Sequence, residues 1–140
     1  MTARRQPRSL GRSLRVSPGF REFVVDQLAE LPDVRARAMF GGVGLHSRGL
    51  FFGIVASDVL YLKVDDATRG RYERAGMTPF RPYPDRSGTM QYYEVPTGVL
   101  ESAVELVQWA REAVSVAERA QIAKSPNHQI AKLPNRQIAK

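Results

Sequence analysis

The sequence predicts a single α+β domain in which one antiparallel sheet packs against helices, with the element order α-βββ-α-ββ-α. Helical periodicity marks both ends of residues 17–120, and short apolar runs of strand character fill the region between them. The links between these runs are too short for parallel connections, which need about a dozen residues. A chain of 140 residues has room for one such two-layer sandwich with tails on either side.

The first helix is expected over residues 18–31. Ser17 can accept a hydrogen bond at the N-cap, and proline is tolerated at the first helical position, which Pro18 occupies. Apolar residues then recur at helical spacing up to Leu31, and Pro32 follows as a stop signal.

Three strands of a meander are expected next, over residues 38–45, 50–56 and 59–64. The polar segments between them, His46–Gly49 and Ser57–Asp58, favour antiparallel hairpins. The glycines of the first strand indicate a bend or bulge, or a close approach of the first helix. A phosphate-binding loop is disfavoured, because no P-loop lysine and no helix follow these glycines.

A second helix is expected over 66–75, where Asp65-Asp66 can cap the start and Gly76 follows the end. Residues 78–83 are compatible with an edge strand only, because prolines interrupt them. The strand that pairs with this edge is expected over 90–95.

The longest helix is expected over 98–119. Its apolar residues cover more than half of the helix circumference. A helix of this kind lies across a sheet or is shared with a partner.

The net charge of +7 is unevenly distributed. Residues 1–16 contain five basic residues, residues 121–140 contain four, and neither segment contains an acidic residue. Residues 17–120 contain 12 basic and 14 acidic residues. Both tails are predicted to be disordered, and the second is a QIAK repeat of period eight with a Pro-Asn pair in each full unit. The tails are either solvated segments or a nonspecific anchor for nucleic acid.

Several function classes are disfavoured by composition. Without cysteine there is no disulfide, thiolate nucleophile or cysteine-ligated metal. No apolar run approaches the roughly 18 residues of a membrane span, so we expect a cytoplasmic protein without a membrane segment. Asp65-Asp66 is better explained as a helix cap than as a metal site, and His46 and His128 have no neighbours that would complete a metal site or a triad. We therefore expect no enzymatic activity and no cofactor.

Four separated blocks of the sequence resemble the N-terminal domain of the TfoX/Sxy competence-regulator family. They are Met39–Leu45, Leu60–Asp66, Met90–Pro96 and Glu105–Arg111. The resemblance covers about residues 20–115. It implies a bacterial cytoplasmic protein with a fold similar to that of secretion chaperones, and a link to the regulation of DNA uptake and transformation.

The resemblance leaves out two features that would define a function for this chain. Competence regulators of full length add a helical C-terminal domain, and this chain has the QIAK repeat in that position. The family supplies no catalytic residues that can be carried over to this sequence.

The first candidate site lies on the strand over 59–64. Strand alternation places Tyr61 and Lys63 on the face opposite Leu60 and Leu62, with Tyr93 or Tyr92 nearby. Aromatic and cationic groups together can stack on and pair with a nucleotide or a peptide. The alternative is ordinary filling of a half-wet sheet face.

The second candidate site is the basic stretch between residues 69 and 86. It carries a local net charge of +3, because it contains five arginines and two acidic residues, Glu73 and Asp85. The arginines are Arg69, Arg71, Arg74, Arg81 and Arg86. They form either a solvated surface or a patch for phosphates or an acidic partner.

A third pattern is weaker. Arg48–Val55 shares only Arg48, Gly49 and Phe52 with the seven constrained positions of an RNA-recognition signature. We expect the aromatic residues of this strand to belong to the core.

Two hypotheses for function follow. The first is a non-enzymatic regulatory module of competence that acts through a protein partner, such as a transcription regulator, or through homodimerisation by the last helix. The alternative is a nucleic-acid-binding protein whose affinity comes from the basic tails and from the stretch between Arg69 and Arg86.

Overall fold

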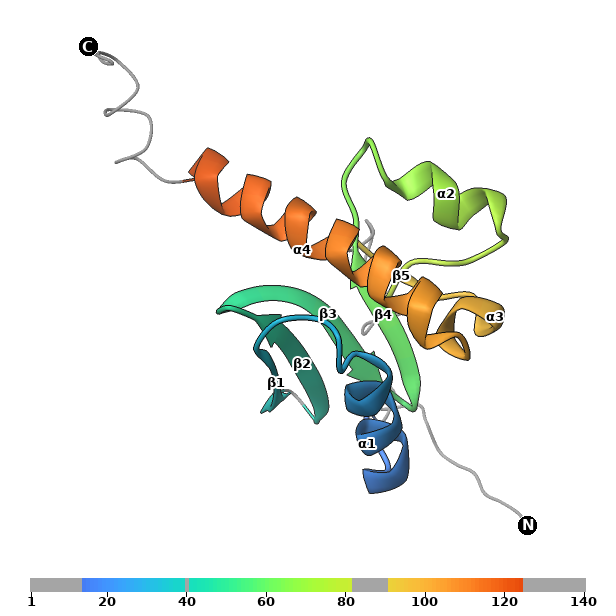
Figure 1. Cartoon of the computed structure of the whole chain (residues 1–140). Helices are drawn as coiled ribbons and strands as arrows, with labels where there is room; N and C mark the ends of the chain where they lie inside the picture. The colour runs from blue at the N-terminus through green and yellow to red at the C-terminus, as the bar shows by residue number, and fades with distance from the viewer. Residues whose placement is uncertain (1–13, 40, 82–90, 125–140) are drawn as a thin grey trace.

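The computed structural model describes residues 14–39, 41–81 and 91–124. A five-stranded antiparallel sheet in the order β1-β2-β3-β4-β5 carries helices on one face (Figure 1). The α+β prediction of an antiparallel sheet packed on helices is confirmed. The elements are α1 (Pro18–Gln27), β1 (Val34–Met39), β2 (Gly42–Ser47), β3 (Leu50–Ala56), β4 (Val59–Lys63), α2 (Arg69–Arg74), β5 (Tyr92–Glu94), α3 (Thr97–Leu100) and α4 (Ala103–Lys124).

Helix α1 begins where the sequence predicts. The Ser17 hydroxyl accepts a hydrogen bond from the Phe20 N–H at 3.2 Å, and the Ser17 N–H donates to Asp58 at 2.8 Å. The helix ends earlier than residue 31, because the chain leaves helical geometry at Leu28 and closes a turn through Leu31 N–H to Leu28 O at 2.9 Å. Both leucines remain buried, which explains why the apolar spacing continues past the helix.

The single strand predicted over 38–45 is wrong: this region is the β1–β2 hairpin. Gly41, with φ +86°, lies between the two strands. Gly42 has no space for a side chain, since a Cβ there would lie 2.7 Å from the Val55 carbonyl oxygen. The close approach predicted for these glycines is therefore to β3 and not to the first helix.

The next two turns match the predicted hairpins. Arg48 and Gly49 connect β2 to β3, and Ser57 and Asp58 connect β3 to β4. All four have positive φ, as in the type I′ turn that suits the twist of antiparallel strands.

A β-bulge separates the two neighbouring aromatic residues of β3. Leu45 pairs with Gly53 and His46 with Phe51, which leaves Phe52 as the extra residue. The Phe52 side chain is fully buried in the core under the helices, whereas Phe51 lies on the opposite face and is half-buried.

Apolar clusters form on both faces of the sheet. The cluster under the helices joins α1 and α4 to the strands. Its members include Val24, Leu28, Leu45, Phe52, Leu62, Leu106, Ala110 and Ala113. The other face holds a smaller cluster of Ile54, Ala56, Tyr61, Phe80 and Tyr92.

Helix α2 is shorter than the predicted 66–75. The Asp65 carboxylate accepts hydrogen bonds from the Ala67 and Thr68 N–H groups, each at 3.1 Å, and so closes the turn that precedes the helix. Gly76, with φ +81°, follows the helix as predicted.

The predicted edge strand over 78–83 is observed as a short bridge along the outer edge of β5. Phe80 N–H donates to Tyr92 O at 2.8 Å, and Glu94 N–H donates to Thr78 O at 3.0 Å. Residues 82 and 83 of that strand and residue 90 of the predicted strand 90–95 lie outside the described residues.

The predicted last helix over 98–119 is two helices, α3 and α4. The break occurs because the Ser102 hydroxyl accepts the Glu105 N–H at 3.2 Å and caps the start of α4. Helix α4 runs on to Lys124, into the first unit of the QIAK repeat. The remainder of the predicted disordered tails, residues 1–13 and 125–140, lies outside the described residues.

Candidate functional site

Tyr61 and Lys63 lie on the sheet face opposite the cluster that packs against α1 and α4, where strand alternation places them. The Tyr61 ring is only 7% exposed and packs on Phe80, with 4.9 Å between ring centroids. The Tyr61 side chain is therefore part of the smaller apolar cluster on this face.

Of the two candidate tyrosines on β5, Tyr92 lies on the same face as Lys63. The Lys63 ammonium is 4.9 Å from the centroid of the Tyr92 ring, a cation–π distance. Burial raises the pKa of the Tyr92 hydroxyl to about 12. Tyr93 points to the helical face, where its hydroxyl donates to the Glu73 carboxylate at 3.0 Å.

A row of rings crosses this face. The His46 ring stacks on Phe51 with 5.0 Å between centroids, and Phe51 lies 5.6 Å from Tyr92. His46 Nδ1 is buried and has no hydrogen-bond partner in the described part of the chain. Burial, with a smaller contribution from the charge of Arg37, lowers the pKa of His46. The row can stack on planar or apolar groups, and Arg37 and Lys63 place positive charge at its two ends.

The predicted basic stretch lies largely on the other side of the sheet. Arg69 pairs with Asp66 at 2.8 Å and with Glu73 at 3.6 Å, and the Asp66 hydrogen bond raises the pKa of its guanidinium. Arg74 and Arg81 are exposed. Arg86 lies outside the described residues.

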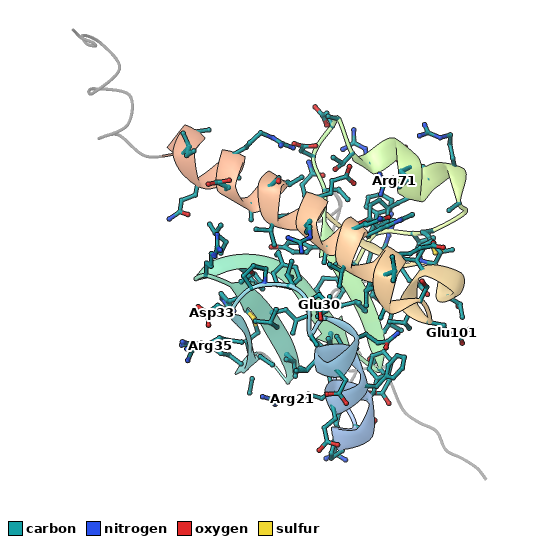
Figure 2. The ribbon with its side chains drawn as sticks, in the orientation of Figure 1. Arg21, Glu30, Asp33, Arg35, Arg71 and Glu101 are labelled. Atoms are coloured by element: carbon teal, nitrogen blue, oxygen red, sulfur yellow. The ribbon has the colours of Figure 1, made fainter. Side chains whose placement is uncertain are left out.

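A separate group of polar and aromatic side chains joins α2 to α4. Tyr72 is buried and packs on Trp109 in a T-shaped arrangement, with 4.9 Å between ring centroids, and the Arg71 guanidinium lies over the Trp109 ring. Figure 2 shows Arg71 between α2 and α4. Burial raises the pKa of the Tyr72 hydroxyl. Arg119 donates to Asp65 at 2.8 Å, and this hydrogen bond lowers the pKa of the Asp65 carboxyl.

The structure thus divides the predicted site residues between two surfaces. Tyr61 and Lys63 are on the open face of the sheet, while Arg69, Arg71 and Tyr93 are engaged with α2 or the helical layer. They do not form one continuous site.

The broad apolar surface of α4 has partners within the chain. Leu106 and Ala110 pack on the sheet, Trp109 packs on α2, and Arg111 donates to the Glu30 carbonyl after α1. Val104 is the most exposed large apolar residue of the helix, at 72%.

The described part of the chain holds neither a metal-binding cluster nor a membrane-spanning helix. In residues 14–39, 41–81 and 91–124, no group of three or more histidine, aspartate or glutamate side chains is arranged to hold a metal ion. None of the helices described in these ranges is both long and apolar enough to cross a membrane.

The sequence profile of the TfoX N-terminal domain matches residues 26–117. The chain belongs to the TfoX N-terminal domain family. The match begins near the end of α1, includes all five strands, α2 and α3, and ends inside α4, so it covers the whole sheet and most of α4. No curated protein matches the chain.

Sequence reasoning missed two features of this TfoX N-terminal domain. The first is the row that begins at His46, which depends on the bulge that turns Phe51 away from the core. The second is β1, whose exposed Arg35 and Arg37 alternate with small residues. The period-two pattern of Val34–Met39 was a usable signal for this strand.

Proposed function

We propose that this TfoX N-terminal domain is a regulatory module without catalytic activity, which acts on competence in the bacterial cytoplasm by binding a protein partner. The observation that carries the proposal is the family match over residues 26–117, because the family is a regulatory one. A transcription regulator is the partner class that this role favours.

The side-chain chemistry is consistent with this proposal. The acidic side chains around α2 are used as structural partners: Asp65 holds Arg119, Asp66 holds Arg69 and Glu73 holds Tyr93. The Glu73–Tyr93 pair joins α2 to β5, the Asp65–Arg119 pair joins the turn before α2 to α4, and the Asp66–Arg69 pair is local to the start of α2.

The test is a deletion of the gene in its host, complemented with the full chain. We expect deletion to lower the frequency of transformation by a marked DNA fragment and the transcript levels of DNA-uptake genes. An affinity-tagged full chain, crosslinked in cells, is expected to retain a transcription regulator. Unchanged transformation and unchanged transcripts in the deletion strain would refute the proposal.

A second candidate is direct nucleic-acid binding through the basic tails and the stretch between Arg69 and Arg86, favoured by the concentration of cations at the two ends of the sequence. Its test is DNA binding by the full chain across a salt series, because affinity from phosphate contacts falls steeply with salt. The variant that replaces the five arginines of residues 1–16 with glutamine is expected to show a shallower slope, and Arg111→Gln on α4 serves as the control.

A further inference from the structure

The outer edge of β1 is a strand edge without a partner among the described residues. The order β1-β2-β3-β4-β5 places β1 at one end of the sheet. The other end is covered, because Thr78 and Phe80 form backbone hydrogen bonds along β5. An uncovered edge is a template for a further strand.

The backbone groups that point outward can be identified. Arg48 N–H donates to Asp33 O at 3.3 Å across the start of the β1–β2 pair. Since hydrogen-bonded and non-bonded pairs alternate in an antiparallel ladder, the residues two and four positions after Asp33 face β2. The N–H and C=O groups of Val34, Ala36 and Ala38 therefore point away from the sheet.

A contact at the middle of the strand supports this assignment. The carbonyl oxygen of Ala36 accepts a hydrogen bond from the Arg21 guanidinium at 2.9 Å. The side chain of Arg21 reaches this edge from α1, on the helical side of the sheet (Figure 2).

Positive charge flanks the edge on both faces. Arg35 and Arg37 are exposed and lie on the open face of the sheet, opposite Arg21. Asp33 pairs with Arg35 at 3.1 Å, but both side chains are more than half exposed, so this ion pair is weak. Figure 2 shows Asp33 and Arg35 pointing outward from the β1 side of the sheet.

We propose that the outer edge of β1 binds an extended acidic peptide segment of the protein partner, which adds as a sixth strand. The N–H groups of Val34, Ala36 and Ala38 and the carbonyl groups of Val34 and Ala38 would supply the hydrogen bonds, while the Ala36 carbonyl keeps its bond to Arg21. Acidic residues at alternate positions of the peptide would face Arg35 and Arg37. This inference rests on the proposed function, since it names the chemistry of the segment that the partner contributes.

The charge pattern argues against a second copy of this chain on the same edge. Antiparallel pairing of β1 with its own copy would bring Arg35 and Arg37 close to the same arginines of the other strand. Like charges on neighbouring strands are destabilising, and cations are a common protection of edges against self-pairing. An acidic strand removes that repulsion.

The test uses the full chain and a fluorescent eight-residue peptide that alternates glutamate with threonine or valine, followed by anisotropy. A peptide of the same composition with its glutamates clustered controls for general attraction to a basic chain. Two further peptides carry backbone N-methyl groups on alternate residues, in one phase or the other. If the peptide adds as a strand, one of the two N-methylated peptides binds at least tenfold more weakly than the unmodified peptide, and the other keeps its affinity.

Variants of β1 provide a second measurement. Ala38→Pro removes an outward N–H without removing a bond to β2, and Ala38→Val keeps that N–H. Arg37→Glu is matched by Arg111→Glu on α4, which changes the net charge equally at an exposed arginine outside both candidate sites. We expect Ala38→Pro and Arg37→Glu to weaken binding at least tenfold, and the two controls to change it less than twofold, with circular dichroism verifying the fold of each variant.

Four outcomes would overturn the proposal. They are equal binding of the alternating and clustered peptides, equal effects of the two N-methyl phases, retained binding by Ala38→Pro, and a dimer on a sizing column that Ala38→Pro abolishes. Tighter binding of a single-stranded oligonucleotide, lost in Arg37→Glu, would assign the edge to nucleic acid instead. If these tests fail while deletion still lowers the transformation frequency, only the docking site is wrong and the proposed function stands.

Discussion

The guanidinium group of Arg71 lies over the indole ring of Trp109, with its carbon 4.6 Å from the ring centroid. The same side chain pairs with Glu112 at 3.4 Å, and the buried Tyr72 ring packs on Trp109 in a T-shaped arrangement. These contacts join a six-residue helix to the longest helix of the domain. A helix as short as α2 is marginal by itself and depends on such packing.

Replacing Trp109 with alanine is expected to lower the free energy of unfolding by about 3 kcal/mol, because it removes the ring between α2 and α4. Arg71→Met keeps most of the aliphatic stem and removes the charge, so its expected cost is about 0.5–1 kcal/mol. Urea denaturation of both variants measures the difference. Equal losses would mean that the charge, and not the ring packing, holds α2 in place.

His46 gives the domain a predicted sensitivity to mild acid. Because its pKa is lowered in the folded protein, the unfolded chain binds more protons, and stability falls as the pH drops below the ordinary histidine value of about 6.5. His46→Phe preserves a ring beside Phe51 and is expected to flatten the dependence of the melting temperature on pH between about 5 and 7. A variant as acid-sensitive as the parent would show that His46 does not carry the effect.

Gly42 and Gly19 are expected to respond oppositely to alanine. At Gly42 the new Cβ would lie 2.7 Å from a backbone oxygen of β3, so the strand pair must shift and the variant loses stability. Gly19 lies inside α1, where a new Cβ would meet no neighbouring side chain or strand within 4 Å, and Gly19→Ala should gain about 0.5–1 kcal/mol. Thermal unfolding of the two variants compares them, and a stabilised Gly42→Ala would contradict the close approach to Val55.

Asp65 links the turn before α2 to the C-terminal half of α4. Because Arg119 holds the pKa of Asp65 below its ordinary value, the stabilisation is present above that value of about 3.9 and is lost as the pH falls through the lower, folded pKa. Arg119→Met is expected to cost about 0.2–1 kcal/mol near neutral pH and to make acid unfolding less steep. The effect at neutral pH should shrink in high salt, and a salt-independent loss would indicate that the arginine stem packs rather than pairs.

Local patterns predicted those elements whose signals are carried by neighbouring residues. Ser17 and Pro18 define the start of α1, Gly76 follows α2, and the alternation of Tyr61 and Lys63 with leucines gives the two faces of β4 correctly. Each is a short-range effect of capping, backbone conformation or strand geometry.

The candidate site was harder to predict, because it depends on which face each strand presents. Tyr92 and Tyr93 are equivalent in the sequence, and only their pairing with Lys63 and Leu62 sends one to the open face and the other to α2. The bulge opposite His46 divides Phe51 from Phe52 in the same way. A shift of one residue in register exchanges the two faces of a strand, so local pattern cannot decide them.

The sequence by itself determined the α+β class, the antiparallel links between the central strands and the family to which the chain belongs. The tertiary structure decided that Gly41 lies between two strands and that the last helix breaks at Ser102. It also decided that β1 ends the sheet with Arg35 and Arg37 exposed. These outcomes depend on contacts between segments distant in sequence, such as Gly42 against Val55. A pattern of neighbouring residues in the sequence does not reveal the energies of such contacts.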